Sequence, residues 1–317
     1  MDRPGPQLRS VPWPLRFLAL AGIWGLSFVF IKLGVESFAP LQVAALRLAI
    51  GAATLLAILV ITSDHLPRRR RTWMHLALGA VFMNVAPFAL FAYGEQRIPS
   101  LLAGIWNATT PLMTLPAAVL LLQTEHATRS RVAGLMIGFL GVLVVLGAWQ
   151  GVGAHDVAGD LMCLGAAACY GVGFPYARRF LAMSGDSPVS LASGQILTGA
   201  IEAGILAVLF TAPPTAVRTD GVLALLALGA LGTGIAYILS YSILRDAGAT
   251  VVSSVTFLLP VVSVIAGVLI LGETLEWNQP VGAVIVVIGA LIIQDRLRVT
   301  SRLRVPWRRR EPRASGP

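Results

Sequence analysis

Long apolar runs separated by short polar segments are the feature that most constrains this chain. Runs of about 18 residues or more with few charges recur along it, and each is long enough to cross a bilayer core of about 30 Å. Hydrophobic residues make up 56% of the 317 residues and charged residues only 12%, whereas soluble domains carry about 25% charged residues. One water-soluble globule cannot bury this much apolar surface, so the sequence predicts a polytopic membrane protein.

Ten membrane spans can be drawn along the sequence. Backbone inside lipid must satisfy its own hydrogen bonds, and no strand-like alternation of polar and apolar residues occurs, so we expect each span to be an α-helix. The expected spans are 15–35, 39–61, 73–93, 99–122, 130–149, 158–179, 188–210, 220–242, 249–271 and 278–293.

Basic residues mark one side of the predicted membrane. The net charge is +9, and Lys32 is the only lysine among 24 basic residues. The arginines gather at both ends of the chain and in every second loop, while the alternate loops hold only Arg97 and Arg218. This distribution is a topology signal and not a nucleic-acid-binding surface, because the arginines lie between apolar runs. It places both termini in the cytoplasm and the protein in the cell inner membrane.

The two halves of the chain repeat one another. Sliding the sequence along itself by about 146 residues aligns "WGLSFVFIK" (24–32) with "YGVGFPYAR" (170–178), and a shift of about 148 aligns Glu125 with Glu273. Five spans are an odd number, so the second half enters the membrane from the opposite side, as in many secondary transporters. The predicted fold class is an all-α integral membrane protein with ten transmembrane helices as two inverted five-helix repeats.

Several motifs follow one another in a fixed order. They are "WG..F...K" at 24–32, "P......R" at 40–47, "TTPLMTLPAAVLLLQTE" at 109–125, "GD" at 159–160, "LLPVVSVIAGVLILGE" at 258–273 and the glycine pairs of spans 5 and 10. Together they resemble the drug/metabolite transporter superfamily, specifically its EamA type with two tandem five-helix domains. The first half departs from the family pattern, since "QTE" stands where "GE" is usual. The resemblance implies transport of a small metabolite, often export of amino acids or related compounds.

The predicted organisation follows from the repeat. Residues 1–14 form a cytoplasmic N-terminus, 15–149 the first EamA-like repeat, 158–293 the second, and 294–317 a basic cytoplasmic tail. The tail is rich in arginine, so we expect it to lie on the anionic inner leaflet of the membrane. It serves either as a stop-transfer anchor or in regulation.

Two prolines at corresponding places in the halves point to a binding site. Pro111 in span 4 frees the carbonyl of Asn107, and Pro260 in span 9 frees that of Thr256. Paired interruptions mark the substrate site of transporters built from repeats, so we predict that both prolines are hinges; a tolerated proline kink is the alternative.

An aromatic and polar cavity is expected around these two positions. Such a cavity suits a small amphipathic solute, although Ser, Thr and Asn also hold helices together in lipid. Besides Asn107 and Thr256, the predicted substrate-binding residues are Trp24, Asn84, Trp106, Thr110, Tyr170, Tyr237 and Tyr241.

Three ionisable residues are candidates for coupling or gating. Arg47 and Glu202 each lie about eight residues from the outer end of their span, or roughly 12 Å deep at 1.5 Å per residue. We therefore consider an Arg47–Glu202 pair and a proton-titrating Glu202, beside a pair that only stabilises the fold. Lys32 ends span 1, where its ammonium either reaches the headgroups or engages an anionic substrate. Glu125 and Glu273 are expected to bind neighbouring loop amides.

The sequence therefore predicts a secondary transporter that rocks its halves around a midplane cavity. The expected activity is proton-coupled export of amino acids or similar metabolites; other metabolites or drugs are the alternative substrates. No phosphate-binding loop occurs in the sequence, which disfavours primary pumping. The partners expected are a small-molecule substrate and membrane lipid.

A membrane enzyme and a membrane scaffold are two other classes of function for a chain of this composition. A membrane enzyme needs clustered His, Cys or carboxylate side chains at one depth, but the histidines fall in or near loops and the acids are scattered. We therefore expect no enzymatic activity, cofactor or metal. A non-transporting membrane scaffold or sensor is the second hypothesis, in which the basic tail would matter most.

Overall fold

Helices joined by short turns form the molecule. The computed structural model describes residues 11–98, 100–122, 125–150, 156–214, 216–262, 264–265 and 276–294, and no strand occurs within these ranges. The predicted all-α membrane fold is therefore confirmed.

The first-half elements are α1 (Trp13–Gly25), α2 (Ser27–Val35), α3 (Pro40–Ile61), α4 (Arg70–Ala80), η2 (Val81–Val85), α5 (Ala86–Glu95), α6 (Ser100–Asn107), α7 (Thr110–Leu121), α8 (Arg129–Val145) and η3 (Ala148–Gln150). The second-half elements are α9 (Val157–Phe180), α10 (Pro188–Phe210), α11 (Thr219–Gly229), η4 (Ala230–Ile235), α12 (Ala236–Ala247), α13 (Ala249–Ser253), η5 (Ser254–Leu258) and α15 (Asn278–Ile293).

Six helical stretches of the described chain are long and apolar enough to cross a membrane. The other apolar helices that the structure describes are shorter or interrupted, so the count of ten spans stays a prediction. The six stretches are Trp13–Val35, Pro40–Ile61, Arg70–Glu95, Val157–Phe180, Pro188–Phe210 and Thr219–Ala247.

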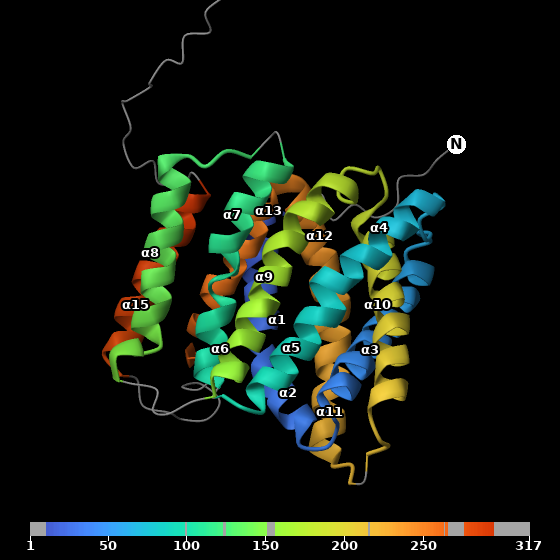
Figure 1. Cartoon of the computed structure of the whole chain (residues 1–317). Helices are drawn as coiled ribbons and strands as arrows, with labels where there is room; N and C mark the ends of the chain where they lie inside the picture. The colour runs from blue at the N-terminus through green and yellow to red at the C-terminus, as the bar shows by residue number, and fades with distance from the viewer. Residues whose placement is uncertain are drawn as a thin grey trace, which may run out of the picture.

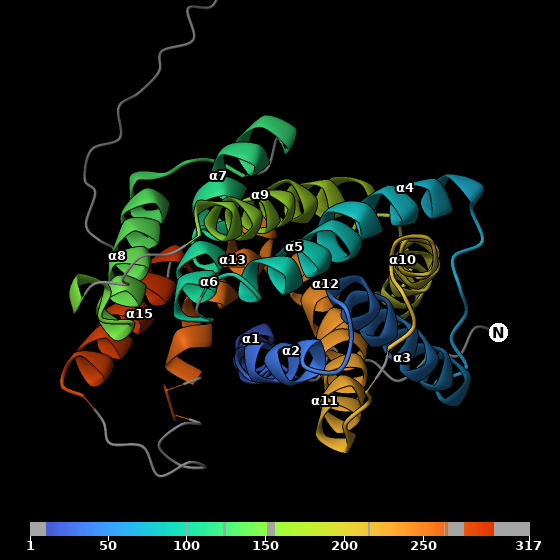
Figure 2. The same cartoon turned by 60° about the horizontal axis from the view of Figure 1, so that its bottom comes forward.

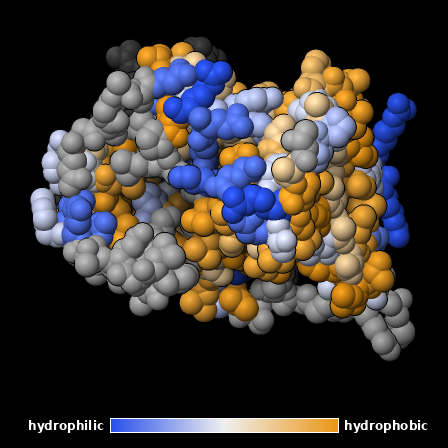
Figure 3. Space-filling view, turned by 90° about the horizontal axis from the view of Figure 1, so that it is seen from below, coloured by the Kyte–Doolittle hydropathy of each residue, from blue (hydrophilic) through white to orange (hydrophobic). Residues whose placement is uncertain are grey.

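The outside of the helix bundle is apolar. Val60, Ile61, Leu120 and Val208 are 77%, 81%, 84% and 82% exposed, which is where a water-soluble protein would carry polar residues. Seen along the helices, hydrophilic residues gather across the middle of one end with apolar residues beside them, and further hydrophilic residues lie at the left and right edges of the view (Figure 3). This surface fits a protein whose sides face lipid.

Helices α8 and α15 form one edge of the molecule and run antiparallel (Figure 1). Asn278, at the start of α15, donates hydrogen bonds to the carbonyls of Val144 and Val145 at the end of α8, at 3.1 and 3.2 Å. Glycines on both helices let the backbones approach: a Cβ at Gly141 would lie 2.6 Å from the amide nitrogen of Val286. This is the small-residue packing that membrane helices favour.

Helices α3 and α10 form the opposite edge, also antiparallel. Gln42, near the start of α3, donates to the carbonyl of Ala212 just past the end of α10, at 2.8 Å. At the other end, Ser187 caps α10 and donates to the carboxylate of Asp64 beyond α3. Counterpart helices of the two halves thus run in opposite directions at both edges, as an inverted repeat requires.

Both halves are interrupted at matching places. The π-helical turn η2 joins α4 to α5, and η4 joins α11 to α12; such turns are rare and occur often at functional sites. A turn at residues 108–109 separates α6 from α7, and α13 passes into the 3₁₀ turn η5. These two breaks therefore recur in both halves, whereas the break between α1 and α2 has no counterpart in the continuous α9.

Pro111 does not kink a continuous helix, which was the alternative to the predicted hinge; the hinge itself stays a prediction. Pro111 lies in the first turn of α7, where a helix has no amide hydrogen bond to lose. Pro260 likewise follows η5 instead of standing mid-helix. The prolines begin new helical segments, and each break lies before its proline.

The α8–α15 contact offers a test of the packing. We expect Gly141→Val to lower the free energy of unfolding by about 1–3 kcal/mol, because its side chain would overlap the α15 backbone. Reversible unfolding in mixed micelles measures this. Gly204→Val in α10 is the matched control, since no atom lies within 4 Å of a Cβ there; equal losses in both variants would refute close packing as the cause.

Candidate functional site

A central cavity lies between the two halves of the chain. The space that the centre of a water-sized sphere can reach in it is about 60 Å³, so the cavity is narrow in this conformation. Helices α1 and α2 form one wall, packed beside α11 and α12 (Figure 2). The lining residues are Trp24, Ser27, Ile31, Arg47, Phe88, Phe91, Asn107, Tyr170, Phe174, Tyr237, Thr256 and Leu259.

Six of the residues expected at the site line this cavity, and six lining residues were not expected. Trp24, Arg47, Asn107, Tyr170, Tyr237 and Thr256 belong to the first group. One signal for the others existed in the sequence: Ser27 and Ile31 lie in the same nine-residue motif as Trp24. Phe88 and Phe91 had none, because sequence spacing does not tell which face of a helix looks into a cavity.

Two aromatic side chains tie the π turns to the opposite half. The indole of Trp24 donates to the carbonyl of Gly232 in η4 at 3.0 Å. The hydroxyl of Tyr237 donates to the carbonyl of Met83 in η2 at 2.6 Å. The two rings also meet edge to face, with centroids 6.2 Å apart. Carbonyls in the two interruptions thus find donors across the cavity, in a region where water is scarce.

Arg47 supplies the positive charge of the cavity wall. Arg47 is only 5% exposed. Its Nε donates to the hydroxyl of Thr233 at 3.2 Å, and its guanidinium carbon lies 3.6 Å from the centroid of the Phe88 ring. Within the described ranges no carboxylate lies at ion-pair distance from it. The hydrogen bond fixes one edge of the guanidinium and leaves its two terminal nitrogens for another acceptor.

The expected Arg47–Glu202 pair is absent from the described structure. Glu202 lies on α10, is half-buried, and does not line the cavity. Its Oε2 is buried, and the described chain offers that atom no hydrogen-bond partner. Equal depth in the membrane failed to predict contact because Arg47 turns toward η4.

The break between α6 and α7 presents Asn107 to the cavity. Asn107 is 5% exposed, and its Oδ1 is buried with no hydrogen-bond partner in the described part of the chain. Thr110 is fully buried and outside the cavity lining, and its hydroxyl also lacks a partner there. In the second half, the Thr256 hydroxyl donates to the carbonyl of Ser253 at 3.0 Å. Asn107 therefore brings to the cavity wall a buried acceptor that has no partner in the described chain.

The other predicted polar residues serve the packing around the cavity. Gln195 on α10 donates to Asn84 Oδ1 at 2.6 Å and accepts a hydrogen bond from the hydroxyl of Tyr241. Trp106 donates to Asp160 Oδ1 at 2.8 Å. These contacts join helices from both halves, which is the helix-joining alternative for such side chains.

Lys32 is exposed on α2 and outside the cavity lining. Its repeat counterpart Arg178 is half-buried and donates to the carbonyls of Leu244 and Arg245 at the end of α12. The two counterparts therefore differ in environment.

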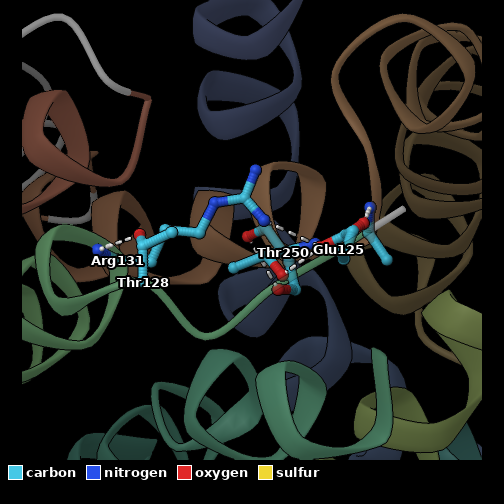
Figure 4. Close-up of polar contacts among 6 residues, drawn as sticks. Glu125, Thr128, Arg131 and Thr250 are labelled. Carbon is cyan, nitrogen blue, oxygen red and sulfur yellow. Dashed lines mark hydrogen bonds and ion pairs between the residues drawn. The ribbon is translucent and has the colours of Figure 1, made fainter. Parts of the chain in front are cut away.

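A buried carboxylate, that of Glu125, binds backbone and side-chain groups at the basic end of the molecule (Figure 4). Glu125 is 7% exposed and accepts hydrogen bonds from the amides of Ala249, at 2.6 Å, and Thr250, at 3.3 Å, and from the Thr250 hydroxyl. Arg131 forms an ion pair with it at 3.5 Å. Gly248 has φ +93°, a conformation that favours glycine. Glu125 binds backbone amides as expected, but these belong to the first turn of α13 and not to a neighbouring loop. Glu273 lies outside the described residues.

No group of three or more His, Cys, Asp or Glu side chains that could hold a metal ion occurs in the searched, described ranges.

Arg97 and Asp156 form an exposed ion pair at the other end of the molecule, with 2.9 Å between Nη1 and Oδ2. The hydrogen bond from Arg97 lowers the pKa of Asp156, and the Ala158 amide adds to this effect. This pair joins the start of α9 to the loop after α5.

Comparison with known proteins places the chain in a family. A model of the EamA-like transporter family matches residues 12–147 and again residues 157–294. The chain belongs to this family. Its two matches give the tandem arrangement predicted from the internal repeat.

Several curated relatives of this EamA protein span nearly its whole length. A transporter of Archaeoglobus fulgidus described as uncharacterized is 30% identical over 280 residues, covering 85% of this chain and 94% of its own. YoaV of Bacillus subtilis, an uncharacterized transporter, is 25% identical and covers 87% and 94%. YedA of Escherichia coli, an uncharacterized inner membrane transporter, is 28% identical and covers 82% and 84%.

A solved crystal structure has the same fold. It superposes with a TM-score of 0.74 at 21% sequence identity, covering 88% of this chain and 95% of the other. These findings make the chain a multi-pass membrane transporter of the EamA type.

The hydrogen bond between Tyr237 and Met83 can be tested directly. We expect Tyr237→Phe to reduce the free energy of unfolding by about 0.6 kcal/mol and by at most about 1.7 kcal/mol, the average and the maximum measured for hydrogen bonds between membrane helices. Reversible unfolding in mixed micelles is the measurement. Tyr93→Phe on α5 is the control, because the Tyr93 hydroxyl makes no hydrogen bond within the described part of the chain. An unchanged Tyr237→Phe protein would contradict a tie between the halves.

Proposed function

We propose that this protein is a secondary transporter that exports amino acids or related small metabolites, coupled to protons, by alternating access. The observation that carries the proposal is a cavity lined by both halves with the buried Arg47 in its wall. A buried guanidinium without an ionic partner is costly, and a carboxylate that binds its two terminal nitrogens would supply the missing charge.

The rest of the lining supports the same class of substrate. Phe88, Phe91, Phe174 and Tyr170 offer apolar surface to a side chain or hydrocarbon body. The free Oδ1 of Asn107 is available to an ammonium or hydroxyl donor. A carboxylate and a donor on the same carbon, with an apolar side chain beside them, describe an α-amino acid or a similar hydroxy acid.

Alternating access follows from the inverted halves, which we assign to residues 15–149 and 158–293. In our proposal the basic end faces the cytoplasm, where the positive-inside rule places arginine. Contacts between the halves at this end, such as Arg16 with Asp246 and Glu125 with Ala249, would part when the cavity opens inward. A scaffold or sensor without transport is the second candidate, and other metabolites or drugs are the alternative cargo.

Substrate counterflow tests the proposed role of Arg47. In proteoliposomes loaded with pooled apolar amino acids, Arg47→Gln should slow exchange of radiolabelled amino acid by about 10–100-fold, as expected on losing a hydrogen bond between charged groups. Lys32→Gln should leave exchange near wild type, because Lys32 is exposed and outside the cavity lining.

Two further outcomes of that experiment are informative. Equal loss in both variants would assign the effect to surface potential and refute the cavity site. If wild-type protein that remains folded exchanges none of the pooled solutes, the amino-acid proposal fails. Asn107→Ala then distinguishes the remaining candidates: it abolishes uptake of any other cargo in a carrier, whereas a scaffold has no uptake to lose.

Proton coupling can be tested at Glu202. An imposed pH gradient should accelerate wild-type flux, and Glu202→Gln should keep counterflow without responding to the gradient, because the amide cannot bind and release a proton. Glu36→Gln is the control, since Glu36 is exposed and pairs with Arg218 at 3.4 Å. A normal gradient response in Glu202→Gln would remove Glu202 from the coupling path.

A further inference from the structure

A second hollow lies on the outside of the molecule, between α7 and α8. The described residues that line it are all apolar, among them Leu112, Pro116, Val119, Val132 and Met136. Helix α8 packs closely on α15 but touches α7 only sparsely, so the space between α7 and α8 is not filled by the described chain. Figure 1 shows the two helices side by side on the same face. We call this hollow the α7–α8 groove.

The groove opens toward lipid and not toward the central cavity. Val119, Val132 and Met136 are 41%, 44% and 48% exposed, and no residue lines both the groove and the cavity. Its walls have the chemistry of hydrocarbon. An elongated apolar occupant from the bilayer therefore matches its position and its lining.

Arginine stands at the basic end of the groove. Arg129 begins α8, and residues 129, 132 and 136 follow the spacing of three and four that places side chains on one helix face. Arg129 is therefore on the same face as Val132 and Met136, one turn nearer the basic end. It is exposed, and no carboxylate of the described chain lies at ion-pair distance from it.

The neighbouring cations differ in what they already bind. Arg131 is paired with Glu125 at 3.5 Å (Figure 4) and belongs to the buried contact described above. Arg179 donates to the carbonyl of Leu121 at 2.8 Å, directly after Leu120 in the groove wall. Arg179 thereby holds a second positive charge at the end of α7, across the groove mouth from the start of α8.

We propose that the α7–α8 groove binds one anionic phospholipid, with an acyl chain between the helices and its headgroup phosphate on Arg129. The apolar walls and the basic mouth match the two parts of such a lipid. A second copy of this chain fits less well, because a symmetric pair would bring two arginine-rich ends together. The site is outside the central cavity and does not depend on the proposed transport function.

Native mass spectrometry of the full chain in detergent tests the site. The probes are dioleoyl phosphatidylglycerol, which is anionic, and dioleoyl phosphatidylcholine, which is zwitterionic. Wild type should bind one phosphatidylglycerol about fivefold more tightly than phosphatidylcholine, the preference expected from one arginine near a phosphate-bearing surface. Arg129→Gln should abolish the preference and leave weak binding of both lipids.

Two matched variants separate the groove from general charge. Arg70→Gln makes the same charge change at an exposed residue that begins α4, away from the groove, and should bind like wild type. Met136→Trp keeps every charge but fills the groove, and should weaken binding of both lipids. Size-exclusion profiles identical to wild type confirm that the variants fold.

Three results would overturn the proposal. Equal loss of phosphatidylglycerol in Arg129→Gln and Arg70→Gln would mean that charge alone attracts lipid. Unchanged lipid binding in Met136→Trp would place the lipid elsewhere. Protein dimers that form without bound lipid and disappear in Met136→Trp would assign the groove to a second copy of the chain.

Discussion

Hydrocarbon offers no partner to a backbone carbonyl, and the centre of this molecule is organised around that constraint. The π turns η2 and η4 leave carbonyls available in the middle of the membrane-facing bundle, and each receives a donor from the other half. Trp24 reaches Gly232, and Tyr237 reaches Met83. The donors are aromatic, so the same residues that satisfy the backbone also present ring surface to the cavity. The side chains that bind the carbonyls of the interrupted helices therefore also form part of the cavity wall.

The repeat explains why much of this was predictable. Matching prolines and polar residues in the two halves located both helix breaks, and Asn107 and Thr256 do line the cavity. Two aromatic residues of the same cavity also follow the repeat, since "WG" and "YG" begin corresponding motifs that carry Trp24 and Tyr170. Structural features that both sequence repeats share can be predicted by aligning the two halves of the chain.

Orientation around a helix axis could not be predicted in the same way. Spacing gives the depth of Arg47 and Glu202, but not the side of α3 or α10 on which each lies, and the two do not pair. Leu48, next to Arg47, lies 3.6 Å from a Cβ built at Gly199 on α10, whereas Arg47 binds Thr233 on η4. Tyr241 is likewise turned to Gln195, away from the cavity lining. Contacts between helices distant in sequence decide these directions, and a single sequence does not contain them.

Arginine serves different physical purposes at the basic end and at the centre of the molecule. At the basic end, Arg131 and Arg178 stabilise turns by binding a carboxylate and backbone carbonyls. At the cavity, Arg47 must be held by Thr233 and Phe88 while leaving donors free. A planar guanidinium can do both, because its Nε and its terminal nitrogens point in different directions. Lysine has one nitrogen on a flexible stem, and its single occurrence at the exposed position 32 agrees with this division.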